Sequence, residues 1–455
     1  MSRGRRLWEN DVLWNAMGSL FYALASMLLA FAVLRLAGPR DGGIFGFGFS
    51  TLGQQLFIVS YFGIRPFHIT DMRGEYSFGE YLRLRCWTCG GAVLLTLLYL
   101  WAMTESGGYS LRRSLILLCL VLCKVADGYA DVYESELQRQ GRLYCAGQSL
   151  FFRTWLLLCT LLVSLALFGE LLLSVALSVL MQLFGLLLFS VRPLRACPPD
   201  TRRSGEAGIQ GVRDGVRRGY PMRLLRSTGL LFLSVFLDFY VFSASKYAVD
   251  QRMGAEASGI FNILFMPASL IYLLANFLIR PMLTRLAEEF REERRRAFLR
   301  TCRLLFGGVA LLAVLVSLAA LLLGGWGLGI FELLLGSRYR GVMRRELPSF
   351  LLLIAGGGLY ALCNVQYYIL VTMRRQREIF LSYLLAALAA FLTAGRMVGR
   401  GGIRAGAGSY FLLMGLLLII FTLWVLYALY GFYHGKTESK DGRRHHSDLS
   451  PGGEI

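Results

Sequence analysis

The chain has 455 residues, of which 56% are hydrophobic and 17% are charged, with a mean hydropathy of +0.54. A soluble protein of this length could not bury that much apolar surface, so the composition excludes a soluble globular enzyme and favours a membrane protein. The net charge of +19 would suit nucleic acid, but its distribution between apolar runs argues against that partner.

About twelve apolar runs are long enough to cross a bilayer, at roughly 20 residues each. The sequence therefore predicts an all-α polytopic membrane protein. The expected spans are 11–36, 44–65, 81–103, 111–133, 146–168, 170–191, 221–248, 257–282, 299–323, 348–372, 378–397 and 405–432.

Basic residues are unevenly divided between the two sides of these spans. Of the 48 Lys and Arg residues, 33 lie on the side that includes the N-terminus and 13 on the opposite side. By the positive-inside rule, the first side is cytoplasmic, and an even number of spans returns the C-terminus to it. We expect a multi-pass protein of the plasma membrane with both termini in the cytoplasm and its basic loops against anionic membrane lipids.

A repeated pattern divides the spans into two halves. Gly-four residues-Gly-Ile-Phe starts at Gly38 and again at Gly254, 216 residues later, and Ile-Arg-Pro follows at Ile64 and Ile279, 215 residues apart. Two related halves of six spans insert with the same orientation, which places their pseudo-two-fold axis along the membrane normal.

The middle break is rich in Pro, Gly and Arg and is predicted to be a basic cytoplasmic linker. The expected organisation is a six-helix lobe over 1–191, the linker over 192–220, a second six-helix lobe over 221–433, and a disordered cytoplasmic tail over 434–455.

Ionisable residues within spans are costly in hydrocarbon and are therefore candidates for a polar interior. In the fourth span, Lys124, Asp127, Asp131 and Glu134 are spaced by 3, 4 and 3 residues, which places them on one helical face. One interpretation is a wet lumen lining. The alternative is a structural ion pair, such as Lys124 with Asp127, that seals helices together.

Two further spans carry charge. Arg153 in the fifth span suits either a bound phosphate or snorkelling to headgroups. In the seventh span, Asp238 is deep enough to face the lumen, whereas Lys246 and Asp250 lie near the outer end and are expected to be exposed.

Uncharged polar residues complete the candidate cavity. About half of them are expected to form interhelical hydrogen bonds instead of lining the cavity. They are Asn15, Gln54, Gln55, Asn262, Asn276, Asn364 and Gln366.

The chain lacks the patterns of an enzyme. It has no Gly-Lys-Ser/Thr phosphate loop, no Ser/His/Asp arrangement, and no His or Cys near its Cys-x-x-Cys pair to complete a metal site. We therefore expect no catalytic residue, no metal site and no bound cofactor.

Several motifs resemble the polysaccharide flippases of the multidrug/oligosaccharidyl-lipid/polysaccharide exporter superfamily. Residues 36–45 resemble the Leu-Gly-Pro…Gly-x-Phe turn before the second helix, and 245–261 resemble its counterpart in the second lobe. Residues 334–339 resemble Leu-Phe-Gly-x-x-Tyr, and 402–407 resemble Gly-x-x-Gly-Ala-Ala with a departure in the second half. The resemblance extends to about residue 432.

The resemblance implies two six-helix lobes that move a sugar-diphospho-polyprenol from the cytoplasmic to the outer leaflet for surface polysaccharide biosynthesis, such as that of lipopolysaccharide. Glycan polymerases and glycosyltransferases would be its partners. A polar headgroup cannot cross hydrocarbon unaided, so such a protein needs a polar route. Coupling to a proton or Na⁺ gradient through Asp127, Asp131 or Asp238, or to the membrane potential, would drive the movement.

Other functions remain open from the sequence. A multidrug or cation antiporter of the same fold would need acidic groups without matching bases, and Lys124 and Arg153 argue against it. A membrane glycan polymerase or ligase usually needs a long outer loop, which this chain lacks. A non-transporting scaffold for glycan assembly is the remaining alternative.

Overall fold

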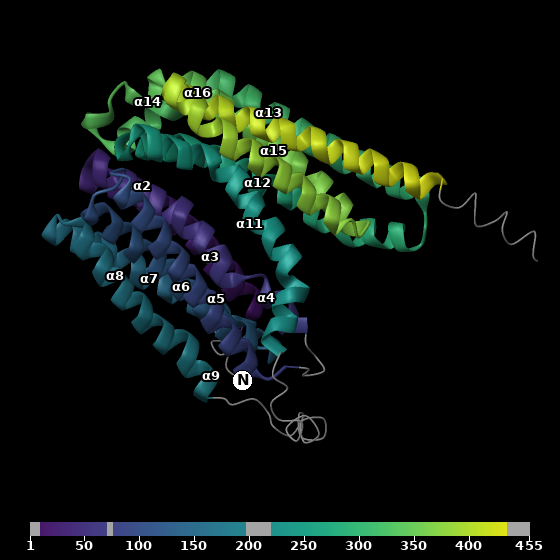
Figure 1. Cartoon of the computed structure of the whole chain (residues 1–455), viewed down its shortest axis with the longest axis horizontal. Helices are drawn as coiled ribbons and strands as arrows, with labels where there is room; N and C mark the ends of the chain where they lie inside the picture. The colour runs from purple at the N-terminus through teal and green to yellow at the C-terminus, as the bar shows by residue number, and fades with distance from the viewer. Residues whose placement is uncertain (1–9, 71–75, 197–219, 435–455) are drawn as a thin grey trace, which may run out of the picture.

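The computed structural model describes residues 10–70, 76–196 and 220–434, and every regular element in them is helical. The helices form two bundles that lean together at one end and diverge towards the other (Figure 1). Most of the linker expected at 192–220 and of the tail expected at 434–455 lies outside the described residues. Within the described part, residues 192–196 continue the first lobe as a short helix.

The first lobe runs from the N-terminus to Ala196. Its helices are α2 (Asp11–Phe47), the π-helix η1 (Gly48–Leu52), α3 (Gly53–Tyr61), α4 (Ile64–Thr70), α5 (Phe78–Glu105), α6 (Leu111–Arg139), α7 (Leu143–Phe168), α8 (Leu171–Gly185), the π-helix η2 (Leu186–Val191) and α9 (Arg192–Ala196). Leu, Val and Phe side chains from α2 to α8 form a core within this lobe.

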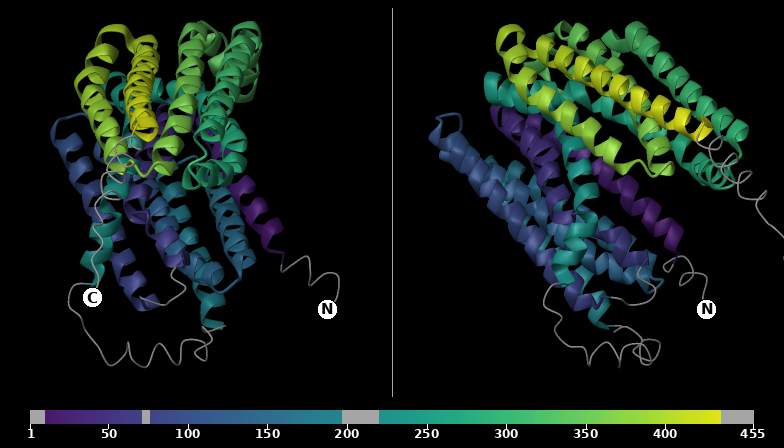
Figure 2. Two further views of the ribbon diagram at one scale, coloured as in Figure 1. Left: turned by 90° about the vertical axis from the view of Figure 1, so that its right-hand side faces the viewer. Right: turned by 45° about the vertical axis from the view of Figure 1, so that its right-hand side comes forward.

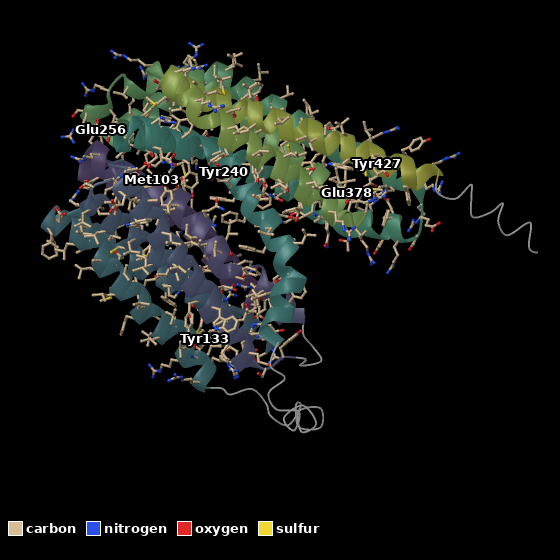
Figure 3. The ribbon with its side chains drawn as sticks, viewed as in Figure 1. Met103, Tyr133, Tyr240, Glu256, Glu378 and Tyr427 are labelled. Carbon is tan, nitrogen blue, oxygen red and sulfur yellow. The ribbon has the colours of Figure 1, made fainter. Side chains whose placement is uncertain are left out.

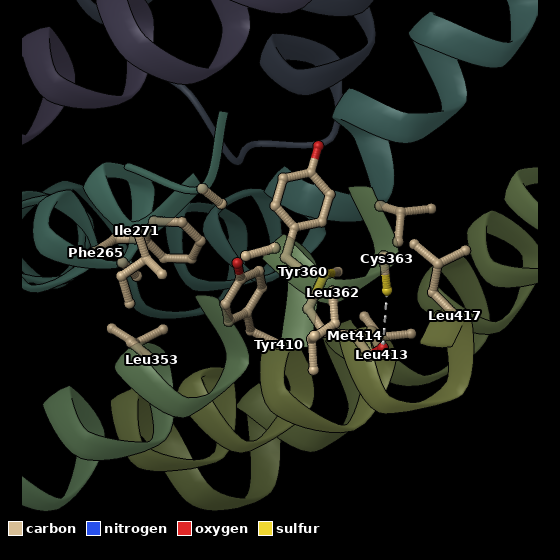
Figure 4. Packing of buried hydrophobic residues seen from close by; sticks show 14 of the residues in the cluster. Phe265, Ile271, Leu353, Tyr360, Leu362, Cys363, Tyr410, Leu413, Met414 and Leu417 are labelled. Carbon is tan, nitrogen blue, oxygen red and sulfur yellow. Dashed lines mark hydrogen bonds between the residues drawn. The ribbon is translucent and has the colours of Figure 1, made fainter. Parts of the chain in front are cut away.

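The second lobe begins at Tyr220. Its helices are α11 (Tyr220–Met253), α12 (Ala255–Arg291), α13 (Arg295–Leu335), the 3₁₀ helix η3 (Ser337–Tyr339), α14 (Val342–Arg345), α15 (Leu347–Thr372) and α16 (Gln376–His434). A separate core fills it, in which Tyr410, Leu413 and Met414 of α16 pack against α15 and α12 (Figure 4). Each lobe is therefore packed around its own interior.

The helices account for the expected spans. In the described residues, nine helical stretches are long and apolar enough to cross a membrane. Two of them contain a non-helical glycine, Gly38 in α2 and Gly402 in α16, at the turn between two expected spans. Counting these as two spans each and adding the charged helix α6 gives twelve segments, six in each lobe, so the predicted all-α two-lobe class is confirmed.

The lobes contact each other mainly at the end opposite the termini, called here the closed end. Met103 of α5 and Glu256 of α12 lie at or near this end, whereas Tyr133 of α6 and Glu378 and Tyr427 of α16 mark the open end, where the lobes diverge (Figure 3). Both α2 and α16 have their outer termini at the open end (Figure 2). By the charge count, the open end is the one expected to be cytoplasmic.

The structure shows the sequence repeat as one backbone feature used twice. Gly38 has φ 83° and ψ 179°, and Gly254 has φ 84° and ψ −176°. This left-handed conformation favours glycine, and at both sites it joins two antiparallel helices at the closed end. The repeated glycines are therefore turn residues, as the pattern predicts.

The repeat offset also has a structural counterpart. The first copy is one residue longer between its Gly and Ile-Arg-Pro anchors, and the π-helix η1 lies between those anchors. A π-helical turn takes up an additional residue within a helix and is frequent at functional sites. In the second copy, Arg280 is exposed within continuous α12, whereas Arg65 of the first copy is the second residue of α4, which follows a break at Phe62.

The second glycine of each repeat forms the closest approach of the lobes. A Cβ atom added to Gly43 would lie 1.7 Å from the carbonyl oxygen of Ala255, and one added to Gly259 would lie 3.0 Å from Cα of Gly43. No side chain fits at Gly43 while the closed end keeps this packing.

We therefore predict that Gly43→Val opens the closed end or destabilises the protein, while Gly307→Val, at an open site on α13, does neither. Opening would be measured with a cysteine placed at Arg40 and a membrane-impermeant thiol reagent. Faster labelling of that cysteine would report that the closed end has opened. Unchanged labelling with unchanged thermal stability of Gly43→Val would contradict the packing.

Candidate functional site

Helix α6 is the central helix of the first lobe. It packs against α3, α5, α7 and α8, and most of its residues are buried despite their charge. Such a helix is excluded from the nine apolar spans because of its polar stripe. The stripe thus faces neighbouring helices of its own lobe and does not face lipid.

Asp131 is the centre of the first charged cluster. Its Oδ1 accepts a hydrogen bond of 2.7 Å from Nη1 of Arg65 on α4, and its Oδ2 accepts one of 2.7 Å from Nη2 of Arg85 on α5. Arg85, which is 1% exposed, also donates to the carbonyl oxygen of Ser60. One carboxylate therefore fixes two helices to α6.

Asp127 and Glu134 are held by Arg153 of α7. Nη2 of Arg153 lies 2.7 Å from Oδ1 of Asp127, and Nη1 lies 3.5 Å from Oε1 of Glu134. Gln182 of α8 also donates to Asp127. With Asp131 and its partners, this makes three acids and three arginines, a buried network without net charge. The acids of the stripe therefore form ion pairs between helices, which is the structural alternative to a lumen lining.

Lys124 does not belong to that network, and its predicted pair with Asp127 is not formed. Its Nζ donates a 2.7 Å hydrogen bond to the hydroxyl of Tyr22 and lies 3.7 Å from the ring centre of Phe49 in η1. The residue is 2% exposed, and no carboxylate is in ion-pair distance within the described residues. It is a buried cation held by an aromatic face.

Lys246 of α11 has the same environment in the second lobe. It is 6% exposed, its Nζ lies 4.2 Å from the ring centre of Phe265, and the described part of the chain offers it no carboxylate partner. Phe265 follows Phe49 by 216 residues, the offset of the repeat. Each lobe thus holds a buried ammonium over the equivalent phenylalanine, although the two lysines come from different helices.

A direct contact between the lobes is made by residues close in sequence to the two phenylalanines. The hydroxyl of Ser50, next to Phe49 in the chain, lies 3.4 Å from Oδ1 of Asn262 on α12. Asn262 is one helical turn before Phe265. We define Lys124, Lys246, Phe49, Phe265 and Asn262 as the lysine site.

The prediction that Lys246 and Asp250 are exposed is wrong. Asp250 is 1% exposed and accepts a 2.5 Å hydrogen bond from Nη2 of Arg113 and another of 2.5 Å from the hydroxyl of Tyr109. Both partners belong to the first lobe. Asp250 is buried because the other lobe covers it, whereas Lys246 lies against Phe242 and Phe265 of its own lobe.

Asp238 lies elsewhere on α11. Its two carboxylate oxygens are each 3.1 Å from the hydroxyl of Tyr360 on α15, and no basic group pairs with it in the described residues. Tyr272 stacks on Tyr360 with ring centres 5.2 Å apart. In Figure 4 the Tyr360 ring points away from Tyr410 and Leu413 of the core. No contact joins Asp238 to the acids of α6, so the charged candidates form separate groups.

The uncharged candidates are mostly interhelical. Asn364 donates to Asn276 at 3.2 Å, and Gln366 donates to Thr422 at 2.7 Å, both inside the second lobe. Gln55, not its neighbour Gln54, reaches α11 by donating to the carbonyl oxygen of Phe236. Gln54 is half-buried without such a contact, and Asn15 is exposed.

Sequence reasoning missed five residues of these groups: Arg65, Arg85, Arg113, Phe49 and Phe265. The three arginines stand at the ends of predicted spans, where headgroup contact is the usual expectation. The two phenylalanines could have been found, because they share the 216-residue offset. Among the described residues, no group of His, Cys, Asp or Glu is arranged to hold a metal ion.

Two six-helix lobes that meet at one end define the MATE-like transporter fold of a multi-pass membrane protein. Two neighbours were solved in inward conformations. An inward-facing multidrug resistance MATE family transporter of the MOP superfamily matches with a TM-score of 0.66 and 12% identity, over 94% of this chain and 100% of that one. The inward closed conformation of the lipid II flippase MurJ matches with a TM-score of 0.60 and 10% identity, over 97% and 94%.

A third neighbour is described by the polarity of its binding pocket. It is a MOP superfamily transporter from Pyrococcus furiosus described as having a binding pocket of reverse polarity, with a TM-score of 0.54 and 12% identity over 95% of this chain and 99% of that one. No family model and no curated protein sequence matches the chain. The neighbours confirm the fold and come from the superfamily that the sequence resembles.

Proposed function

We propose that the protein is a flippase that moves a polyprenyl-diphosphate-linked oligosaccharide from the cytoplasmic to the outer leaflet by alternating access, for surface polysaccharide biosynthesis. The observation that carries this proposal is a pair of buried lysines, one in each lobe, that have no carboxylate partner among the residues the structure describes. An unpaired buried cation is costly, and an anion that enters between the lobes would remove that cost at both.

The chemistry of the lysine site favours a diphosphate over a cationic drug. Phe49 is next to Ser50 and Phe265 is one turn from Asn262, so both ammonium groups belong to segments that meet at one contact between the lobes, where one diphosphate could bind both lobes. A cation at the same place would face two like charges. The reverse pocket polarity of the Pyrococcus furiosus neighbour is described as suggesting a different function for that protein, which is in keeping with a cargo that differs between proteins of this fold.

The membrane potential would assist this movement. With the cytoplasm negative, each negative charge moved outward gains about 2.3 kcal/mol per 100 mV. For ion coupling, we propose Asp238, because it has no basic partner in the described residues, whereas Asp127 and Asp131 are committed to arginines. Its aromatic neighbours also favour the antiporter alternative, in which Asp238 would receive a cationic cargo.

The experiment that tests the function uses the purified chain in sealed vesicles containing a fluorescent polyprenyl-diphosphate sugar. We expect the protein to expose the inner-leaflet pool to an outside quencher several-fold faster than protein-free vesicles do. Export of a cationic dye without lipid movement would support the antiporter. If the protein moved neither the dye nor the lipid, the non-transporting scaffold would be the remaining alternative. In cells, depletion should leave the lipid-linked sugar in the cytoplasmic leaflet.

A further inference from the structure

Lys246 and Asp250 lie four residues apart on the continuous helix α11. Residues at this spacing are neighbours on one helical face and are close enough for an ion pair. Both side chains are buried. Nevertheless, they are not paired with each other in this structure.

Asp250 is held by the first lobe. Nη2 of Arg113 and the hydroxyl of Tyr109 each lie 2.5 Å from one of its oxygens, and the Arg113 guanidinium lies 3.9 Å from the ring centre of Tyr109. The three groups thus form a lock across the closed end. Because Arg113 and Tyr109 both belong to the first lobe, separation of the lobes at this end would remove them together and leave Asp250 with only the hydroxyl of Ser258 on α12.

Lys246 is directed away from this lock. Its ammonium lies 5.7 Å from the ring centre of Phe242, one turn towards the start of the helix, and 4.2 Å from that of Phe265. This is the usual direction of a helical side chain. With Asp250 held by Arg113, Lys246 has no carboxylate partner in the described residues.

A buried carboxylate that loses both partners is strongly destabilised unless it finds another cation. Arg252 is nearer in sequence, but it is exposed and lies two residues on, off the helical face of Asp250. On that face the nearest cation of α11 is Lys246, and a lysine side chain has enough rotatable bonds to turn by one helical turn. We propose that Asp250 exchanges Arg113 for Lys246 when the closed end opens, and that this exchange releases the anion from the lysine site.

This inference rests on the proposed function, since it takes the cargo to be a diphosphate. It gives Asp250 the role of a positioning residue, which acts on the cargo only through Lys246. The site then holds an anion while the closed end is shut and loses half of its charge when that end opens. Release of the anion is thereby coupled to the opening of the closed end.

Two variants that break the same lock distinguish this exchange from a simple latch. In Arg113→Gln, Asp250 is free to pair with Lys246, so affinity for farnesyl diphosphate should fall about tenfold. In Asp250→Asn, no carboxylate remains to pair with Lys246, so affinity should be unchanged or higher. If Arg113 and Asp250 only held the closed end shut, both variants would change the affinity in the same direction. Binding to the purified full-length protein is measured by titration.

Controls separate the exchange from misfolding. Arg112→Gln alters the neighbouring arginine, which pairs with Asp41 and Glu170 inside the first lobe, and should leave affinity unchanged. Tyr109→Phe removes one hydrogen bond from Asp250 and should weaken binding less than Arg113→Gln, in a protein whose packing is conserved.

A second readout does not depend on the cargo. Lys246 is one of only four lysines, so its acetylation by acetic anhydride can be followed by mass spectrometry. Arg113→Gln should slow that reaction and Asp250→Asn should not, because a paired ammonium reacts less. Absence of diphosphate binding by the unaltered protein would overturn the proposed function. Equal acetylation rates in the two variants would overturn the exchange.

Discussion

Replacing Asp131 with alanine should lower the free energy of unfolding by about 3–5 kcal/mol, because it leaves the buried Arg85 and the half-buried Arg65 without this carboxylate. Arg85 is the more costly of them, since its side chain is 1% exposed and cannot reach water. The loss should appear as a large drop in the thermal transition of the purified protein and in its expression.

The matched control is Asp41→Ala. Asp41 also binds an arginine bidentately, but that arginine, Arg112, has a side chain that is 42% exposed. Its removal should cost about 0–1 kcal/mol. If both variants lost the same stability, the buried network would not be a structural element of the first lobe.

This result would also bear on ion coupling. Acids that each hold one or two arginines are poor sites for reversible protonation, because a protonated carboxyl group loses the charge that pairs with those arginines and joins the helices. Asp238 is free of that constraint in the described residues, which is why we assign coupling to it and not to α6.

The spans and the division into lobes could be predicted because they depend on local features. Hydrophobic length defines a span, and the Gly38 and Gly254 repeat marks a turn that only glycine adopts easily. These features need no knowledge of neighbouring helices. Even the one-residue change in the repeat offset has a local counterpart, the π-helix η1.

The partners of the buried charges could not be predicted in the same way. The spacing of Lys124, Asp127 and Asp131 predicts one face of α6, but spacing within a helix says nothing about which neighbours face each side chain. Arg153 of α7 and Arg85 of α5 supply the actual partners. For Asp250, depth along the span suggested exposure, and the contact with the other lobe reversed it.

Substituting both lysines should have the largest effect on cargo binding. In Lys124→Met, Lys246→Met, affinity for farnesyl diphosphate should fall by about a hundredfold, and each single substitution by about tenfold, since a hydrogen bond to a charged group contributes roughly 1.5–3 kcal/mol. Methionine keeps the length of the apolar stem, so contacts with Phe49 and Phe265 remain. Flipping in vesicles should fall in parallel.

The control for overall charge is Arg291→Met, Arg300→Met. Both arginines are exposed, on α12 and α13, and their loss removes the same two positive charges. Binding should then change by less than about twofold, because exposed charges are screened by salt. If the two double variants weakened binding equally, the diphosphate would be attracted by the general surface charge. A different result would show that each lobe contributes one ammonium to the same anion. In that result only the double lysine variant loses most of the binding, and Lys124→Met, which keeps Lys246, binds with about tenfold lower affinity. That outcome would explain how one ligand can bias the relative position of two lobes that otherwise have separate cores.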